Sequence, residues 1–245
     1  MEEWKLKPAR DLALPNPQRF GSVERENSLI ETGLHHVWWP LVWCYLRLAH
    51  RLDIRGREHL PAEPPFILVA NHESHLDALV IAAFLPARLR DHVFSIAAGD
   101  LFFETSVRAV LSASVLNALP MWRKKCGPAS LQILRQRLVE DPCGYILFPE
   151  GTRSRDGTMG RFKPGLGCLV TESPVPVVPC HLHGTFQCLP PNRIFPRFYK
   201  IVLTIGEPLH FSSVTNERPG WEEVARTTEA VVRRLGESAR DFVGG

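Results

Sequence analysis

The chain has 245 residues, of which 44% are hydrophobic, so it is long enough to bury a core in one domain of ordinary size. Its 29 basic and 26 acidic residues leave a formal net charge of only +3, which excludes a protein that binds a polyanion with its whole surface. The six cysteines show no CxxC pair and no framework spacing, which favours free thiols in a reducing compartment over a disulfide scaffold.

Residues 1–28 mix charged residues with prolines and contain no apolar stretch. A secretory signal peptide needs an apolar centre, so we do not expect these residues to act as one. Low hydrophobicity together with frequent proline also disfavours a packed structure. We therefore predict a loose arm that drapes over the surface.

Residues 29–55 are the most membrane-like part of the chain. Residues 37–46 carry no charge, and the segment includes three tryptophans and two arginines: Trp38, Trp39, Trp43, Arg47 and Arg51. A transmembrane helix needs about 20 apolar residues, so this shorter run, which is interrupted by Pro40, is not expected to cross a bilayer. Tryptophan beside arginine is typical of a helix among lipid headgroups, and we predict such an interfacial helical segment. The alternative is a helix that packs on the core of the domain itself.

From residue 64 onward, short apolar runs alternate with longer helical patterns. Strands are predicted at residues 64–71, 92–98, 117–121, 144–151, 175–182 and 200–206. Helices are predicted at residues 74–86, 101–116, 128–141 and 221–242, the third with Leu131, Leu134 and Leu138 on one face. The alternation predicts an α/β fold: a single domain with a mainly parallel sheet flanked by helices, which the interfacial segment precedes.

The first polar motif, NHESHLD at residues 71–77, follows the first of these strands. Open α/β sheets bind their ligands at this carboxyl edge, so Asn71 and His72 are expected at a site. If His72 lies before the first helical turn, its imidazole can reach back to Asp77. An acid on one ring nitrogen leaves the other free to take a proton from a hydroxyl, which predicts His72 as a general base and Asp77 as its orienting partner. Ser74 and Asp77 also form a capping-box pattern, so Asp77 could instead only stabilise the helix.

The other side chains near this motif suggest weaker alternatives. We expect His75 to lie on the helix surface and Glu73 to be solvated. A serine hydrolase that uses Ser74 is disfavoured because the chain contains no GxSxG motif. A zinc site at Cys180, His183 and Cys188 lacks a fourth nearby ligand, and we predict no metal.

The second polar motif, at residues 148–154, places an acid and an arginine on a turn after another strand. Arg153 can form a two-pronged hydrogen bond to phosphate oxygens, and Glu150 can accept hydrogen bonds from hydroxyl groups, which together suit a polyol phosphate. Arg123 and Lys163 could add positive charge, whereas Lys124 and Lys125 are expected to be solvated. The alternative is an ordinary polar loop.

The two motifs resemble the NHxxxxD and FPEGTRS blocks of the glycerolipid acyltransferase family, which contains the lysophosphatidate acyltransferases. VPVVP at residues 175–179 resembles a further block, and the resemblance covers residues 52–209. It implies an acyltransferase domain at residues 56–245, His72 as the base and Asp77 as its partner. It also implies a set of acceptor-binding residues, Glu150, Gly151, Arg153 and Arg123, with Asn71, Thr152 and Lys163 as accessory positions.

The same resemblance implies a reaction without a cofactor or a metal, in which acyl-CoA or acyl carrier protein donates a fatty acyl group to a lysophospholipid. The acceptor that it favours is 1-acylglycerol-3-phosphate, and the product is phosphatidic acid. The expected setting is the cytoplasmic face of a membrane, where the protein is peripheral or monotopic, contacts membrane lipids and has no nucleic-acid partner.

The chain departs from the family pattern at residues 97–101, where AAGDL stands in place of a lysine-rich stretch. With fewer cations available, an acceptor without a phosphate stays open, such as a glycolipid or another lysolipid. A membrane lipid-binding protein without turnover is the other alternative, and the intact base with its orienting acid argues against it.

Overall fold

Strand β2, Phe66–Ala70, is buried along its whole length at the centre of the sheet, as its uninterrupted apolar sequence predicts. The computed structural model describes residues 29–98, 115–121, 128–141 and 143–240, together with Ser22, Arg25 and Ser112. In these residues the strands form one seven-stranded sheet in the order β1-β7-β6-β2-β5-β3-β4, and only the β6–β7 pairing is antiparallel. The predicted α/β fold with a mainly parallel sheet is confirmed.

Each of the predicted strands is present within a few residues of its expected bounds. Besides β2, the strands are β1 Asp53–Arg55, β3 Val93–Ala98, β4 Ala118–Met121, β5 Gly144–Leu147, β6 Val177–His183 and β7 Val202–Ile205. The helices are α2 Leu29–Ala49, α3 Leu76–Phe84, α4 Ala87–Arg90, α7 Pro128–Glu140, α8 Gly165–Val170, α9 Thr185–Cys188 and α10 Arg218–Arg240, with a 3-10 turn at Arg57–His59. Most of the helix predicted at residues 101–116 lies outside the described residues.

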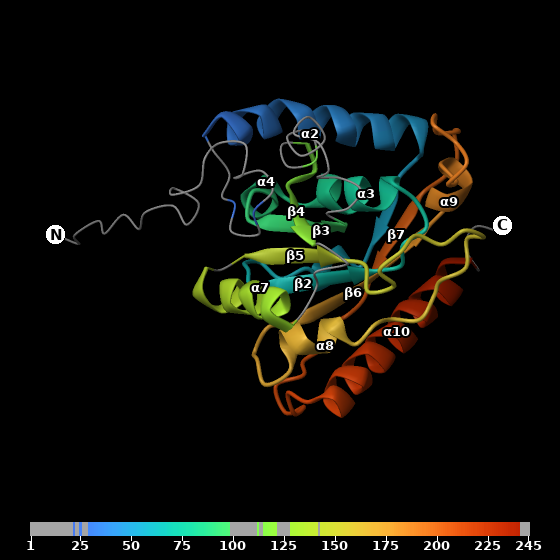
Figure 1. Cartoon of the computed structure of the whole chain (residues 1–245). Helices are drawn as coiled ribbons and strands as arrows, with labels where there is room; N and C mark the ends of the chain where they lie inside the picture. Colours follow the sequence, from blue (N-terminus) through green and yellow to red (C-terminus); the bar gives the residue numbers. More distant parts are fainter. Residues whose placement is uncertain are drawn as a thin grey trace.

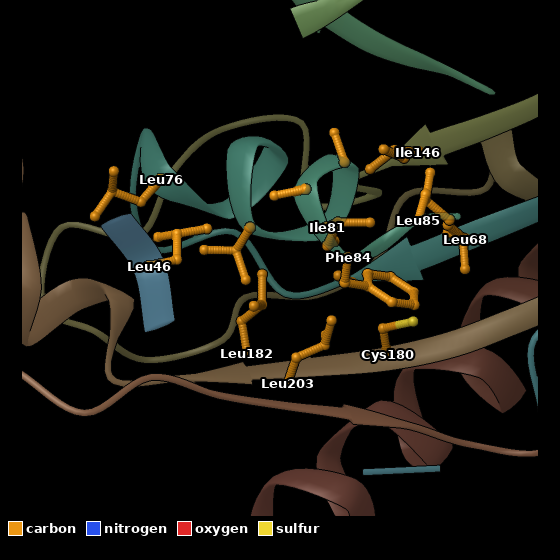
Figure 2. Packing of buried hydrophobic residues seen from close by; sticks show 14 of the residues in the cluster. Leu46, Leu68, Leu76, Ile81, Phe84, Leu85, Ile146, Cys180, Leu182 and Leu203 are labelled. Carbon is orange, nitrogen blue, oxygen red and sulfur yellow. The ribbon is translucent and has the colours of Figure 1, made fainter. Parts of the chain in front are cut away.

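Two helical layers cover the sheet (Figure 1): α2 and α3 on one face, and α7, α8 and α10 on the other. Side chains alternate between the faces along each central strand because successive residues of a strand point in opposite directions. Figure 2 shows the first layer, where Leu68 of β2, Cys180 of β6 and Ile81 of α3 meet in one apolar cluster.

Helix α2 turns Trp39 inward, which corrects the prediction that this side chain faces lipid headgroups. Trp39 is 0% exposed, and Trp38 and Trp43 are partly buried against the same core cluster. The guanidinium of Arg90 lies 5.4 Å from the ring centre of Trp39. Trp39 is therefore a packing residue, as the core-packing alternative proposed, and Trp38 and Trp43 pack on the core with part of their surface.

The outward face of α2 nevertheless exposes several aliphatic side chains. Its exposed side chains include Leu34, Val37, Leu41 and Leu48, with exposed fractions from 50% to 82%. Positions 34, 41 and 48 recur every two turns and thus lie on one stripe. Among the described helices, none is sufficiently long and apolar to span a bilayer.

Of the predicted amino-terminal arm, only Ser22 and Arg25 belong to the described residues. Arg25 is buried, and its guanidinium donates hydrogen bonds to Glu31 at 2.9 Å and to Asn117 Oδ1 at 2.7 Å. Its carbonyl oxygen accepts a hydrogen bond from Arg137 at 2.8 Å. Arg25 therefore links the segment before α2 to the first turn of α2, to the residue that precedes β4 and to α7.

The opposite environments of two apolar residues of α2 give a stability prediction. Trp39→Ala should lower the free energy of unfolding by about 3–5 kcal/mol because it leaves a large cavity in the core. Leu48→Ala removes an 82% exposed side chain and should change it by less than about 0.5 kcal/mol. Urea unfolding of the two variants measures the difference. Equal losses would mean that Trp39 does not anchor the helix to the domain.

Candidate active site

Asn71, the first residue of the first motif, extends the pairing of β2 with β6 through its side chain. The Asn71 side-chain amide donates to the carbonyl of Leu182 at 2.9 Å, and its oxygen accepts the Leu182 N–H at 2.8 Å. Asn71 is fully buried, so it has a structural position behind the site. These two hydrogen bonds fix the point at which the chain leaves the sheet.

His72 lies before the first turn of α3, and its imidazole reaches back to Asp77. The distance from His72 Nδ1 to Asp77 Oδ2 is 2.9 Å, and Asp77 is fully buried. The same carboxylate oxygen accepts the backbone N–H groups of Glu73 at 2.7 Å and Ser74 at 2.8 Å. One acid thus combines the two predicted contacts: it orients the imidazole and it stabilises the start of the helix.

The turn formed by these contacts places two neighbouring side chains in unexpected positions. Glu73 was predicted to be solvated, but it is buried and accepts a hydrogen bond from Asn71 at 3.0 Å, because the turn folds back toward β6. The Ser74 hydroxyl is buried as well; it donates to the carbonyl of Leu189 at 2.9 Å and accepts the Leu76 N–H at 3.2 Å. The Ser74 hydroxyl therefore stabilises the turn and is not available as a nucleophile.

The second motif holds the backbone of His72 on both sides. Glu150 Oε1 accepts the His72 N–H at 2.7 Å, and the carbonyl of His72 accepts the Ser154 N–H at 2.8 Å. The other oxygen of Glu150 accepts the Gly160 N–H at 2.8 Å. Burial raises the pKa of Glu150, and these two N–H donors oppose that effect. Both oxygens of the carboxylate therefore accept backbone N–H groups, and Glu150 does not line the pocket. The sequence had predicted instead that Glu150 contacts the acceptor substrate.

Gly151 allows the tight turn that follows. Its φ of +73° is left-handed, and a side-chain carbon there would come within 2.5 Å of Lys163 Nζ. Further along, Asp156 accepts hydrogen bonds from the Thr158 hydroxyl at 2.6 Å, the Thr158 N–H and the Ser154 hydroxyl, which lower the pKa of Asp156 to about 2. These hydrogen bonds fix the conformation of the loop that follows Arg153.

The imidazole of His72 is also held by an aromatic ring. It stacks on Phe148 with 4.2 Å between ring centres and 19° between planes. With Nδ1 on Asp77 and one face on Phe148, the Nε2 atom is the part of the ring left for a substrate. A neutral imidazole in this arrangement has Nδ1 protonated and Nε2 as the proton acceptor.

The imidazole borders a pocket of about 510 Å³. Its wall combines polar side chains with apolar side chains and with the buried hydroxyl of Ser95. The polar residues are His72, His75, Thr152, Arg153, Ser154 and Arg155, and the apolar ones include Ile96, Leu116, Met121, Leu147 and Phe148. Such a combination suits an amphipathic ligand.

Arg153 is the half-buried cation of this wall. Partial burial lowers the pKa of Arg153, and the charge of Asp77 opposes that effect. Among the described residues it forms no ion pair, so its guanidinium is available to an anion. His75 lies at the exposed rim of the pocket, as predicted. The pKa of His75 is lowered, mainly because its ring is partly shielded from water and to a smaller extent because of the charge of Arg153.

The predicted site residues are thus divided among three places. His72, Gly151, Thr152 and Arg153 lie on the pocket wall, and Asp77, Glu150 and Asn71 support them from behind. Lys163 is exposed beside Gly151, and Arg123 lies outside the described residues. The backbone contact of Glu150 could be missed from sequence because it joins residues 78 positions apart. Within the described part of the chain, no group of His, Cys, Asp and Glu is arranged to hold a metal ion.

Comparison with known proteins yields consistent similarities. A family model described as Acyltransferase matches residues 51–183. The chain is 34% identical over 147 residues to 1-acyl-sn-glycerol-3-phosphate acyltransferase alpha of Homo sapiens, covering 58% of this chain and 50% of that protein. It is 27% identical over 192 residues to the 1-acyl-sn-glycerol-3-phosphate acyltransferase of Bacillus subtilis (strain 168), covering 78% and 90%. The chain spans about half the length of the mammalian relatives that it matches.

A solved structure is similar over most of the fold. It is the crystal structure of the 1-acyl-sn-glycerophosphate (LPA) acyltransferase PlsC from Thermotoga maritima, with a TM-score of 0.63 and 26% sequence identity. The match covers 84% of this chain and 79% of that one. The family match includes both polar motifs, because residues 51–183 contain His72 and Arg153.

The contacts of Glu150 give a prediction about the stability of the site. Glu150→Ala should lower the free energy of unfolding by about 1–3 kcal/mol for each of the two buried N–H groups that lose their acceptor. Glu150→Gln keeps one acceptor oxygen and should lose less. Urea unfolding measures both losses, and hydrogen exchange of the His72 and Gly160 amides should accelerate in the alanine variant. Unchanged exchange at these two amides would contradict the contacts described.

Proposed function

The chain belongs to the acyltransferase family, and we propose that it transfers a fatty acyl group from an acyl thioester to the free hydroxyl of 1-acylglycerol-3-phosphate, giving phosphatidic acid. The observation that carries the proposal is His72, oriented by Asp77 from behind, on the wall of a pocket that is lined by arginine and by apolar side chains. The names of the relatives support the acceptor, since these proteins are 1-acyl-sn-glycerol-3-phosphate acyltransferases.

The proposed chemistry follows from the hydrogen bond between His72 and Asp77. Asp77 fixes the tautomer in which Nε2 of His72 is unprotonated, and this nitrogen removes the proton of the acceptor hydroxyl. The hydroxyl oxygen forms a bond to the thioester carbonyl carbon, and the carbon–sulfur bond then breaks. The thiolate leaves and takes the proton back from the imidazolium, so the protein ends unchanged. General-base help of this kind is worth about 10²- to 10⁴-fold in rate.

No acyl-enzyme is needed for this transfer. The Ser74 hydroxyl, which is the nearest candidate nucleophile in sequence, is buried and donates to the carbonyl of Leu189. The acyl group therefore passes directly from the thioester to the acceptor hydroxyl. Its chain would lie along the apolar lining that includes Ile96, Leu116 and Met121.

The acceptor phosphate would bind to Arg153. A guanidinium offers two parallel N–H donors that match two phosphate oxygens, and Arg153 stands beside His72 without an ion-pair partner among the described residues. Because both oxygens of Glu150 accept backbone N–H groups, Arg153 carries the headgroup recognition that sequence alone divided between the two residues.

The setting that we propose is the cytoplasmic face of a membrane. The aliphatic outward stripe of α2, with Leu34, Leu41 and Leu48, would lie in the outer part of one leaflet, which makes the protein peripheral or monotopic. The donor would be an acyl thioester of coenzyme A or of acyl carrier protein, in accordance with the motif resemblance. Membrane lipids supply the acceptor and take up the product.

The test of the base is His72→Ala. This variant should fold normally, because the imidazole lines the pocket and belongs to neither core cluster, but it should lower acyl transfer by at least about a hundredfold. Transfer from a labelled acyl thioester to lysophosphatidate measures the effect. His75→Ala removes the other imidazole of the pocket wall, to which the mechanism assigns no proton transfer, and should cost less than about tenfold. A His72→Ala variant at the wild-type rate would refute the mechanism.

Asp77→Asn provides the matched test of the partner. If Asp77 orients the imidazole, turnover should fall as well as the free energy of unfolding, because the same oxygen also accepts two backbone N–H groups. A loss of stability with unchanged turnover would reduce Asp77 to a helix cap.

The acceptor phosphate is tested by Arg153→Lys. The substitution keeps the charge but loses the planar pair of donors, so the acceptor KM should rise while kcat changes little. The measurement compares lysophosphatidate with the monoacylglycerol that lacks the phosphate, on wild type and on the variant. Arg155→Lys, at the next arginine of the pocket wall, is the control and should keep the preference. If wild type uses both acceptors equally well, the acceptor is a neutral or sugar-bearing lysolipid instead.

A further inference from the structure

The loop between α9 and β7 exposes a second group of large apolar side chains. Ile194, Phe195 and Phe198 have exposed fractions of 86%, 80% and 85%, which among the large apolar residues described are matched only by Leu48. Three such residues within five positions form an apolar patch that a soluble surface does not need. None of them is a member of either core cluster.

The loop has a fixed conformation. Arg197 N–H donates to the carbonyl of Cys188 at 2.8 Å, and the Cys188 thiol donates to the carbonyl of Arg197 at 3.2 Å. Arg193 N–H donates to the carbonyl of Pro190 at 3.0 Å, and the loop also contains Pro191 and Pro196, which restrict the backbone. The apolar side chains therefore project from a braced segment.

This loop lies beside the carboxyl end of α2 (Figure 1). His50 Nδ1 lies 3.2 Å from the carbonyl oxygen of Tyr199, and the Ile201 N–H donates to the carbonyl of His50 at 3.0 Å. The other ring nitrogen of His50 lies 3.0 Å from the hydroxyl of Tyr45 on α2. The loop thus lies next to the carboxyl end of α2, where the outward stripe ends at Leu48.

The opposite end of the loop reaches the pocket. Pro191 lines the pocket that His72 borders, and Leu189 accepts the hydrogen bond of Ser74 from the turn of the first motif. A surface that binds the loop therefore lies next to the pocket mouth.

The charges of the loop indicate what covers it. Residues 189–201 contain Arg193, Arg197 and Lys200 and no acidic residue, and the two arginines alternate with the apolar side chains. Exposed Arg47 and Arg51 follow at the end of α2. Apolar tips that alternate with cations match the boundary of an anionic bilayer, where the tips enter the acyl region and the cations meet lipid phosphates.

We propose that residues 190–199 form a second membrane contact that inserts Ile194, Phe195 and Phe198 into an anionic leaflet beside the pocket mouth. The contact rests on the proposed function for its purpose, since it would bring the pocket to the leaflet that holds the acceptor. Together with the stripe of α2, it gives the protein two points of attachment and hence a fixed orientation on the membrane.

The first test measures binding of the full chain to vesicles of phosphatidylglycerol and phosphatidylcholine in equal parts. The triple variant I194S/F195S/F198S should bind at least about tenfold more weakly, because it removes three apolar side chains whose insertion into the leaflet favours the bound state. Ile133→Ser with Val139→Ser, which changes two exposed apolar residues of α7 on the other face of the sheet, is the matched control and should bind as wild type. Wild-type affinity of the triple variant would overturn the proposal.

The second test uses the unchanged protein and does not depend on how a variant folds. Vesicles should slow backbone hydrogen exchange at residues 193–199 as well as in α2. Slowing in α2 alone would overturn the loop contact. The proposal would also be overturned if exchange at these residues slowed without vesicles when the protein concentration is raised. A second copy of the chain would then cover the loop.

The charge is tested separately by Arg193→Gln and Arg197→Gln. Each should weaken binding to the anionic vesicles about fivefold and leave binding to pure phosphatidylcholine unchanged. Turnover of a monomeric short-chain thioester and a short-chain lysophosphatidate should stay at the wild-type level in all loop variants. Absent turnover in wild type would count against the proposed function, whereas the vesicle measurements decide the loop contact on their own.

Discussion

The position of the His72 backbone is the constraint on which the rest of the site depends. Its N–H is bound by a buried carboxylate of Glu150, and its carbonyl accepts the N–H of Ser154. A hydrogen bond to a charged group in a dry environment is worth more than a neutral one, about 1.5–3 kcal/mol, so the first contact is strong. Because the imidazole is carried on this peptide, its distance to Asp77 and its stacking on Phe148 follow from the backbone position.

The parallel sheet explains why two motifs so far apart in sequence meet at this peptide. β2 and β5 are neighbours, and Val69 is paired with Leu147. If that register is extended by three residues, His72 stands opposite Glu150, so both loops leave the sheet at the same edge. β6 lies on the other side of β2 and supports Asn71. The order of three adjacent strands therefore delivers the base, its backbone anchor and the half-buried arginine to one pocket.

Much of this arrangement could be predicted because it depends on local pattern. The strands could be predicted from short apolar runs. The contact between His72 and Asp77 could be predicted because residues five positions apart can meet only if His72 lies in a turn before the helix. The partners of Glu150 and Glu73 could not be predicted, since each depends on which strands are neighbours. Trp39 was misplaced for a related reason: α2 is apolar on two faces, and its composition does not say which face meets the core. Arg123 lies outside the described residues.

The inward tryptophans have a consequence for how a lipid surface could be engaged. Trp39 under the guanidinium of Arg90, and His35 at 2.7 Å from Asp91, fasten α2 to the domain without any contribution from a bilayer. The helix is thus fully packed on one side in water, and its aliphatic side needs no rearrangement to meet lipid. The loop that follows α9 is braced in the same way, through Cys188. Both apolar surfaces are therefore held rigidly relative to His72, so contact with a membrane at these two places would determine how far the pocket stands from the headgroups.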